Sequence, residues 1–343
     1  MNPGTDADPT IAPLAPPTAV AGSVTSSEAV ESANLSDASQ PTTPPDTPAT
    51  PIQPAPAVIA VSTPRDMDIQ PGTVAPGSHA RPLPRIIAIA NQKGGVGKTT
   101  TTVNLGASLA ELDYRVLVVD LDPQGNATTG LGINPRTLEV TVYDVLLNDV
   151  GLDECVEPTE VKGLFVAPAS LDLAGAEIEL VPTFSRESRL KRALAEVIDD
   201  YDYVLIDCPP SLGLLTVNAL VAATEVLVPI QCEYYALEGL GQLLETVEMV
   251  KAHLNPGLDV STILVTMYDA RTRLAAGVAE EVREHFGDQV LKTTIPRSVR
   301  VSEAPSYGQT VMTYDPGSPG AMSYLDAARE LAEKGLAAQE VTT

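Results

Sequence analysis

The sequence predicts an α/β fold in which helices flank a mostly parallel, doubly wound sheet. Continuous apolar runs rich in valine, isoleucine and leucine recur along the chain, and helix-length amphipathic segments separate them. A parallel sheet covered on both faces gives this alternation, because its strands are buried on both sides. A glycine-rich loop also links the first run to the first helix, and acidic residues close two of the runs. Since ligands of such sheets bind beyond the carboxyl ends of the strands, we expect the functional site there.

The apolar pattern predicts strands and helices between residues 86 and 334. We expect strands at 86–90, 116–120, 164–168, 203–207, 226–230, 261–267 and 289–294. We expect helices at 98–112, 186–200, 212–222, 237–254, 273–286 and 321–334. The two kinds of segment alternate over most of this span, which indicates one sheet with crossover helices.

Residues 1–84 differ in composition from the rest of the chain. They hold 17 of the 30 prolines and no aromatic residue, and are otherwise mostly Ala, Thr, Ser, Val and Asp. Such a segment buries too little apolar surface to fold, so we predict a disordered tail. The remaining chain is long enough for a single α/β domain, which we place at residues 85–337, followed by a short C-terminal tail at 338–343.

The protein is acidic, with a formal net charge of −24. Eight acidic and two basic residues give residues 1–84 a charge of −6, which leaves −18 for the rest. Any DNA contact must therefore come from a local basic patch. Neither a secretory nor a membrane segment is recognisable, and the three cysteines are widely spaced without a CxxC pair. We expect a cytoplasmic protein without a disulfide framework.

The loop at residues 92–100, Gln-Lys-Gly-Gly-Val-Gly-Lys-Thr-Thr, has the composition of a nucleotide-binding loop. Glycines let backbone N–H groups converge on phosphates, and the helix N-terminus that follows favours negative charge. Lys98 would contact the β- and γ-phosphates, and the Thr99 hydroxyl would bind Mg²⁺. The generic pattern has glycine where this chain has Gln92, and a second lysine, Lys93, stands at the loop's entrance. The predicted nucleotide contacts in the loop are Lys93, Gly94, Gly95, Val96, Gly97, Lys98, Thr99 and Thr100.

Acidic residues follow two predicted strands and extend this site. Asp120 and Asp122 come after the second strand, two residues apart, and so share one side of an extended chain. Asp122 would orient or deprotonate the attacking water, and Asp120 would hold Mg²⁺ through water. Asp207 ends the strand at 203–207 and is a further candidate for a metal-bound water. The alternative for Asp207 is a cap on the helix that starts near residue 212.

Five ordered motifs together resemble the ParA-type chromosome-partitioning ATPases, bacterial members of the deviant Walker A group. They are KGGVGKTTT, DLDPQGNAT, DCPPSLG, TMYDARTRLA and IPRSVRVSEAPSYG, and the resemblance runs from about residue 85 to residue 334. It implies a P-loop ATPase that uses ATP and Mg²⁺ and forms an ATP-sandwich homodimer. It further implies nonspecific DNA binding on the nucleoid, and slow hydrolysis that a ParB-type centromere-binding protein stimulates.

The resemblance also implies roles for individual residues. Lys98 matches the phosphate lysine, Thr99 the magnesium ligand and Asp122 the residue needed for hydrolysis. Lys93 matches the signature lysine that reaches the partner subunit's nucleotide. A second lysine at the same phosphates in cis would suffer like-charge repulsion, whereas in trans it acts like an arginine finger.

Four positions near the C-terminus complete the set implied by the resemblance. Pro296 and Ser298 match the segment beside the adenine ring, and Arg271 and Arg300 match positions that contact DNA. Composition alone does not predict DNA binding here, because residues 268–300 carry six basic and five acidic residues. If a dimer brings the basic residues of two copies onto one face, each copy neutralises a few DNA phosphates, and binding does not depend on the base sequence.

Several alternatives remain open. The final predicted helix is acidic and alanine-rich, which counts against the membrane anchor of MinD-type ATPases, and the cysteine spacing gives no sign of a bridging iron–sulfur cluster. A tyrosine kinase with this loop should end in a tyrosine cluster, which this chain lacks. A nucleotide-controlled binding module and a small-molecule ligase are further possibilities. Residues 1–84 are either a passive spacer or a tether to a polar scaffold protein, and chromosomal and plasmid duty are not separated.

Overall fold

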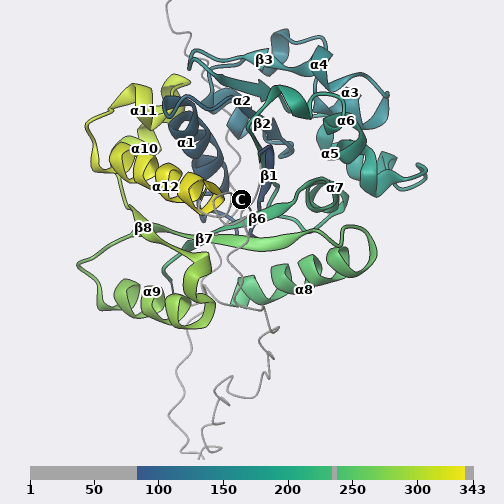
Figure 1. The fold of residues 1–343 in the computed structure, drawn as a ribbon. Coiled ribbons are helices and arrows are strands. Elements are labelled where there is room, and N and C mark those ends of the chain that lie inside the picture. Colours follow the sequence, from purple (N-terminus) through teal and green to yellow (C-terminus); the bar gives the residue numbers. More distant parts are fainter. Residues whose placement is uncertain (1–82, 234–237, 337–343) are drawn as a thin grey trace, which may run out of the picture. The chain divides into compact units, whose positions relative to one another are not determined.

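The computed structural model of the chain describes residues 83–233 and 238–336. Its centre is an eight-stranded sheet in the order β3-β4-β2-β5-β1-β6-β7-β8 (Figure 1). All neighbouring strands are parallel except β3 and β4, which are antiparallel. The mostly parallel α/β fold predicted from the sequence is therefore confirmed. The predicted tails, apart from Leu83 and Pro84, lie outside the described residues.

The strands are short and mostly buried. Their bounds are Arg85–Ile89 (β1), Val116–Asp120 (β2), Glu157–Pro158 (β3), Leu164–Ala167 (β4), Tyr203–Asp207 (β5), Glu225–Gln231 (β6), Asp259–Tyr268 (β7) and Val290–Pro296 (β8). The seven predicted strands are all present, with ends shifted by two residues at most. Continuous apolar runs identified them because strands covered on both faces carry no polar alternation.

The helices connect the strands in chain order. Their bounds are Lys98–Glu111 (α1), Asn126–Gly130 (α2), Val142–Leu147 (α3), Leu152–Cys155 (α4), Leu173–Glu179 (α5), Arg189–Leu194 (α6), Leu214–Ala222 (α7), Glu238–His253 (α8), Arg273–Phe286 (α9), Val299–Glu303 (α10), Val311–Tyr314 (α11) and Pro319–Leu336 (α12). Short 3₁₀ turns lie at Pro135–Thr137, Arg186–Ser188, Ile198–Asp200, Gly287–Gln289 and Ala304–Tyr307.

One predicted helix is wrong in extent. The segment 186–200 forms a 3₁₀ turn, the short helix α6 and a second 3₁₀ turn instead of one continuous helix. Asn218 of α7 explains the interruption at the start, because its amide donates to the Arg186 carbonyl and accepts from the Leu190 N–H. Side-chain bonds from a neighbouring helix thus replace helical bonds at this point.

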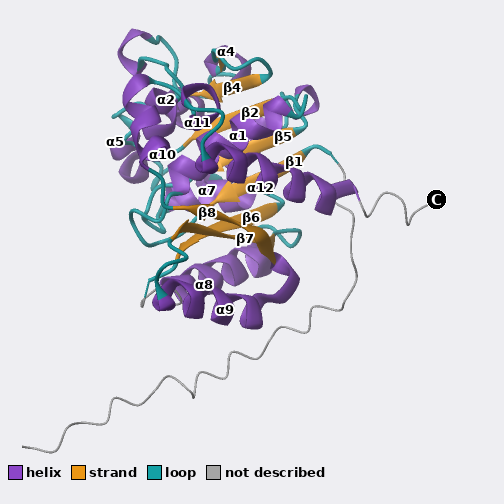
Figure 2. Ribbon diagram, turned by 90° about the vertical axis from the view of Figure 1, so that its left-hand side faces the viewer, coloured by secondary structure: helices purple, strands orange, loops and turns teal. Residues whose placement is uncertain are grey.

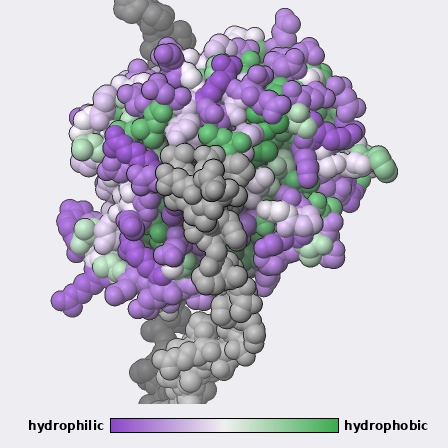
Figure 3. Space-filling model, viewed as in Figure 1, coloured by the Kyte–Doolittle hydropathy of each residue, from purple (hydrophilic) through white to green (hydrophobic). Residues whose placement is uncertain are grey.

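Two apolar clusters lie on opposite faces of the sheet. One contains buried side chains of α1, α2 and α10 to α12, and the other those of α3 to α9. Figure 2 shows the strands running from β4 at the top to β7 near the bottom, with α8 and α9 beneath. On the face seen in Figure 3, hydrophilic side chains dominate and hydrophobic ones are scattered. The sheet is therefore the buried middle layer, and its carboxyl ends form one edge of the domain.

The opposite edge is fixed by a buried ion pair. Arg85, at the start of β1, donates from Nε and Nη2 to the two carboxylate oxygens of Glu225 at 2.7 and 2.8 Å. Its Nη1 donates to the Leu331 carbonyl of α12 at 2.7 Å. The two charged side chains are only 2% and 1% exposed. Three elements distant in sequence are thereby joined where β1 and β6 begin.

Candidate nucleotide site

The glycine loop between β1 and α1 has the backbone that a phosphate cradle needs. Gly95 and Gly97 have φ of +73° and +88°, in the left-handed region that favours glycine. Gly97 is the N-cap of α1, and no side chain caps that helix. Its first N–H groups are therefore available to an anion, and the helix dipole adds to the attraction. From β7, the Thr266 hydroxyl donates to the Val96 carbonyl at 2.8 Å and holds the loop in place.

Lys98 turns back into this loop. Its side chain is 7% exposed, and Nζ donates to the Lys93 carbonyl at 3.3 Å. Burial lowers the pKa of this ammonium group, and the nearby Asp207 carboxylate opposes that shift. A buried cation held by a long hydrogen bond to a backbone carbonyl is well suited to receive phosphate oxygens.

Lys93 lies at the mouth of the loop and is paired within its own chain. Its Nζ is 2.7 Å from Glu233 Oε2, and the two side chains are 31% and 48% exposed. Glu233 follows β6, and its other oxygen accepts from Gln231 at 2.6 Å. The two loop lysines thus differ: Lys98 is buried in the cradle, and Lys93 faces outward.

Two buried carboxylates stand next to each other behind the loop. Asp120 and Asp207 are register partners at the ends of β2 and β5, and both are fully buried. Burial raises the pKa of each carboxyl group, and their mutual repulsion raises that of Asp207 further. Thr102 of α1 donates to Asp207 Oδ1 at 3.0 Å, whereas Asp207 Oδ2 is buried without a hydrogen-bond partner among the described residues.

Asp120 is bonded more completely than Asp207. Its Oδ2 accepts from the Thr128 N–H at 2.8 Å and from the Thr128 hydroxyl at 2.7 Å. Its Oδ1 accepts from the Asp122 N–H at 3.2 Å. The Thr128 hydroxyl in turn accepts from the Ala169 N–H at 3.0 Å. Asp120 therefore ties together the segments that follow β2 and β4, while its predicted role toward metal-bound water stays a prediction.

The remaining acidic candidate, Asp122, is 7% exposed and accepts from the Gln124 N–H at 3.0 Å. It lies beyond the end of β2, on the side of the sheet edge that holds the glycine loop. The alternative for Asp207, a helix cap, is wrong. The N-cap of α7 is Gly213, six residues further on, and no side chain caps that helix.

The residues present fit a magnesium ion. Asp207 offers a buried oxygen that lacks a partner in the described part of the chain, and the Thr99 hydroxyl lies close enough to influence its pKa. Carboxylate, hydroxyl and phosphate oxygens are the hard ligands that Mg²⁺ prefers. No group of three or more His, Cys, Asp or Glu side chains able to hold a metal occurs in 83–233 and 238–336. The bound nucleotide would therefore have to supply part of the coordination.

The positions assigned to the adenine ring and to DNA lie along the same sheet edge. Pro296 ends β8, and Ser298 is the N-cap of α10. Arg271 follows β7, is 88% exposed and forms two 2.8 Å bonds with Asp269. Arg300 is 54% exposed and contacts the carboxylates of Glu303 and Asp315 at 3.1 and 3.3 Å. Both arginines are accessible, and both are already paired with carboxylates of their own chain.

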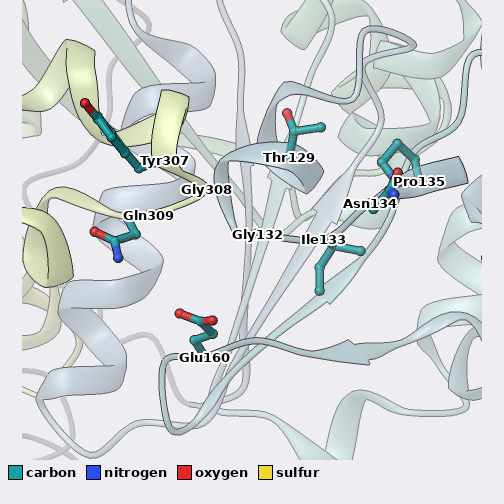
Figure 4. A pocket seen from close by; sticks show the side chains of 9 residues that line it. All are labelled: Thr129, Gly132, Ile133, Asn134, Pro135, Glu160, Tyr307, Gly308 and Gln309. Atoms are coloured by element: carbon teal, nitrogen blue, oxygen red, sulfur yellow. The ribbon is translucent and has the colours of Figure 1, made fainter. Parts of the chain in front are cut away.

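An open cleft of about 430 Å³ lies between the segment that follows α2 and the 3₁₀ turn that ends at Tyr307 (Figure 4). It is lined by Thr129, Gly132, Ile133, Asn134, Pro135, Glu160, Tyr307, Gly308 and Gln309. Gly132 and Gly308 both have positive φ, and their backbones approach so closely that a Cβ on Gly308 would lie 3.1 Å from the Gly132 Cα. None of the lining residues is a predicted nucleotide contact.

Sequence reasoning missed three residues that organise the site. Thr102 bonds Asp207 from one turn inside α1, Thr128 anchors Asp120, and Glu233 pairs with Lys93. Thr128 is the last residue of the DLDPQGNAT motif, which begins with Asp120. A hydroxyl residue in the same motif is therefore the signal by which Thr128 could have been predicted. Glu233 gave no local signal, because its proximity to Lys93 depends on β6 lying next to β1.

Comparison with known proteins places this geometry in a family context. A family model described as "AAA domain" matches residues 84–260, just over half of the chain. The sporulation initiation inhibitor protein Soj of Bacillus subtilis is 61% identical over 251 residues, which is 73% of this chain and 99% of that protein. The chromosome partitioning protein ParA of Caulobacter vibrioides is 54% identical over 254 residues, or 74% of this chain and 95% of that protein.

A solved structure extends the comparison to bound ligands. The cobyrinic acid a,c-diamide synthase of Mycobacterium smegmatis, crystallised with ADP and magnesium, aligns with a TM-score of 0.64 at 44% sequence identity. The alignment covers 73% of this chain and 94% of that chain. None of the helices in the described part of the chain has the length and apolar character that crossing a bilayer requires.

Proposed function

The chain belongs to the Soj/ParA family of chromosome-partitioning ATPases, and from that premise we propose that ATP joins two copies of it into a dimer that binds DNA. It is an ATPase whose cofactors are ATP and Mg²⁺. One observation carries the proposal beyond the family assignment: the loop holds two lysines in opposite environments. Lys98 is buried in the cradle, and Lys93 stands at its mouth.

The position of Lys93 supports a role in trans. Its ammonium group pairs with Glu233 and its side chain is 31% exposed, whereas Lys98 is buried in the loop. Two copies that meet at this edge would each offer Lys93 to the other's phosphates. Because the nucleotide then lies between two cations from different subunits, the dimer gains stability only when nucleotide is bound.

The same geometry supports the proposed hydrolysis. Asp122 lies at the sheet edge with one oxygen bonded to a backbone N–H, and we assign it to orient the attacking water. Lys98 binds the phosphates, and Thr99 and Asp207 hold Mg²⁺, with Asp120 behind them. When bound, the metal ion neutralises charge that develops on the phosphate oxygens. The protein's own part is positioning and water exclusion, which suits a slow, partner-controlled enzyme.

DNA binding and partner stimulation complete the proposed cycle. Arg271 and Arg300 follow neighbouring strands, so a dimer would present two such pairs to the phosphate backbone. A ParB-type centromere-binding protein then promotes hydrolysis and returns the protein to a monomer of low DNA affinity. On this proposal the protein is associated with the nucleoid. The domain division at residue 85 and a tether to a polar scaffold through residues 1–84 remain predictions.

The experiment that tests this function measures ATP turnover with DNA, with the ParB-type protein of the same organism, with both and with neither. We expect a slow basal rate and full stimulation only with both. Sedimentation with a nonhydrolysable ATP analogue should show dimers of wild type and monomers of Lys93→Ala. Lys162→Ala, which removes an exposed lysine elsewhere, is the matched control. Full stimulation without DNA, or single protomers at every analogue concentration, would refute the cycle.

Two other functions make different predictions. A nucleotide-controlled binding module would release DNA at an unchanged rate in Asp122→Ala, whereas the proposed cycle predicts that this variant stays bound. The ligase alternative is favoured by the likeness to the M. smegmatis synthase. A ligase should turn over ATP in response to its carboxylate substrate and a nitrogen donor, and should ignore DNA.

A further inference from the structure

Four large apolar side chains are exposed together in the segment that follows β4. Leu171, Ile178, Val181 and Phe184 are 79%, 77%, 54% and 90% exposed. They come from α5 and the chain on either side of it, and we call them the α5 patch. Phe184 is one of only three phenylalanines in the chain. Four large apolar side chains exposed within fourteen residues point to an interaction site, because exposing apolar surface to water is unfavourable in the free protein.

A chain of hydrogen bonds connects the α5 patch to the buried carboxylates at the carboxyl ends of β2 and β5. Two residues before Leu171, the Ala169 N–H donates to the Thr128 hydroxyl at 3.0 Å. The same hydroxyl donates to Asp120 at 2.7 Å, and Asp120 pairs in register with Asp207. A movement of the segment that carries the patch would therefore shift Thr128 and change the hydrogen bonds of Asp120, which lies next to Asp207.

A second contact joins the α5 patch to the loop after β5. Glu177 of α5 lies against Gly213, where an added Cβ would stand 2.0 Å from Glu177 Oε1. That oxygen is buried and has no hydrogen-bond partner among the residues described. Gly213 is the N-cap of α7 and ends the loop that starts after Asp207. A buried carboxylate oxygen without a partner costs free energy, and a shift of α5 that exposed this oxygen to water would recover that cost.

Charge around the patch identifies the kind of occupant. Residues 171–185 contain Asp172, Glu177 and Glu179 and no basic residue. The next two cations are already paired, Arg186 with Glu187 at 2.8 Å and Arg189 with Asp149 at 2.7 Å. An anionic lipid surface would be repelled. Two copies that met through this same patch would bring their acidic residues together, with no basic residue between 171 and 185 to pair with them.

We propose that the α5 patch docks a basic amphipathic segment of the protein that stimulates ATP hydrolysis. Apolar side chains of that segment cover Ile178 and Phe184, and its lysines or arginines meet Asp172 and Glu179. Docking shifts α5 and acts on the nucleotide edge through Thr128 and Gly213. The inference rests on the proposed function, since it names the surface through which the ParB-type partner acts.

Phe184→Ser and Asp172→Lys test the surface, and Met249→Ser is the matched control. Met249 is 59% exposed on α8, outside the patch. All three positions are exposed and none belongs to the nucleotide site, so basal turnover should stay within about twofold of wild type. With DNA present, the partner concentration for half-maximal stimulation should rise about tenfold or more in the two patch variants, and stay unchanged in Met249→Ser. Equal stimulation of Phe184→Ser and wild type overturns the proposal.

A direct binding measurement separates failure of this inference from failure of the proposed function. The probe is a fluorescent synthetic helix of leucine and lysine, compared with one in which glutamate replaces lysine. Wild type should bind the lysine peptide, and Phe184→Ser should bind it about tenfold more weakly. If the partner does not stimulate ATP turnover by the wild type, the proposed function is wrong. Peptide binding then still shows whether the α5 patch is a docking surface. If Phe184→Ser instead abolishes dimers formed with the ATP analogue, the patch is a self-interface and the proposal is wrong.

Discussion

Asp120 and Asp207 are completely buried register partners on β2 and β5, yet the chain satisfies them unequally. Asp120 accepts three hydrogen bonds, two of them from Thr128. Asp207 accepts one from Thr102 and keeps one buried oxygen without a partner in the described structure. Asp120 is therefore the better bonded of the two, and Asp207 has an oxygen that could bind the Mg²⁺ ion of the proposed function. Two such groups cannot both ionise cheaply without a nearby cation.

Replacing Asp207 by an uncharged residue should stabilise the nucleotide-free protein, and the gain in stability should increase as the pH rises. Burial and Asp120 raise the pKa of its carboxyl group, so the folded state keeps a proton that the unfolded state has lost. Stability then falls with rising pH between about 4 and the raised folded pKa. Asp207→Asn should gain roughly 1–3 kcal/mol near pH 8 and much less near pH 5, because each pKa unit is worth about 1.4 kcal/mol.

Urea unfolding of the nucleotide-free protein at the two pH values measures this difference. Asp200→Asn, which alters an exposed carboxylate, is the control and should show the wild-type pH dependence. The same Asp207→Asn variant should lose the magnesium dependence of nucleotide binding. Parallel pH profiles for wild type and Asp207→Asn would show that the pair carries no strain.

Loss of the Thr128 hydroxyl should lower the free energy of unfolding, because this one group takes part in two buried hydrogen bonds. Thr128→Val leaves the Ala169 N–H without its acceptor and takes one hydrogen bond from Asp120. An unsatisfied buried group costs about 1–3 kcal/mol, so we expect a loss of that order in the free energy of unfolding. Thr129→Val is the comparison, since the Thr129 hydroxyl bonds to backbone carbonyls of its own turn. Equal losses in the two variants would contradict the anchoring role.

Most of the fold could be predicted from the sequence because its central strands are buried on both faces. Apolar runs placed seven strands and five of six predicted helices within two residues of their ends. The missed elements, β3 and the helices α2 to α5, α10 and α11, are seven residues or shorter. Helices of that length make only one or two turns, which is too short for an apolar pattern to identify them, and local side-chain bonds decide them. The Asp144 capping box that starts α3 is one such bond.

The candidate site was less predictable, because its parts meet through strand order. Local motifs identify the glycine loop, Asp122 and Asp207. No local pattern tells that β5 lies between β1 and β2, which sets Asp207 against Asp120. Nor does any pattern tell that Glu233 comes to Lys93 from β6. Contacts between residues about 140 positions apart depend on topology and are visible only once the sheet is assembled.

The ion pair at the far edge of the sheet gives a prediction about folding alone. Glu225→Gln leaves the buried Arg85 guanidinium without its counter-charge, and we expect a loss of about 3–5 kcal/mol. The double variant Arg85→Met, Glu225→Leu should recover much of this loss, because no buried charge remains. Denaturant unfolding of Arg85→Met, of Glu225→Leu and of the double variant measures the coupling between the two side chains. A double variant as unstable as Glu225→Gln would mean that packing, and not charge, is what fails.

The pair formed by Lys93 and Glu233 should be easy to break. Its side chains are 31% and 48% exposed, and pairs of that exposure contribute roughly 0–1 kcal/mol. Glu233→Gln should therefore leave the free energy of unfolding within about 0.5 kcal/mol of wild type. It should lower the ATP-analogue concentration needed for dimers by about two- to fivefold, since Lys93 is freed for the second nucleotide. Sedimentation across an analogue titration measures the shift, and weaker dimerisation would show that Glu233 itself belongs to the interface.

The pairing of Arg271 with Asp269 sets how strongly this arginine can hold DNA. Arg271 keeps the pKa of Asp269 at about 2, so the carboxylate stays ionised and always competes with phosphate. Asp269→Asn should raise DNA affinity about two- to fivefold at low salt, while Arg271→Glu should abolish retention without affecting ATP binding.

Fluorescence anisotropy across a salt series, with the ATP analogue present, separates charge from structure. Arg271→Ala should reduce the slope of log affinity against log salt by about one for each copy that contacts DNA. Arg136→Ala, which removes an arginine far from this segment in sequence, should leave the slope unchanged. If Arg271→Glu loses ATP binding together with DNA binding, the variant is misfolded. If Asp269→Asn weakens DNA binding, the carboxylate positions the arginine and does not compete for it.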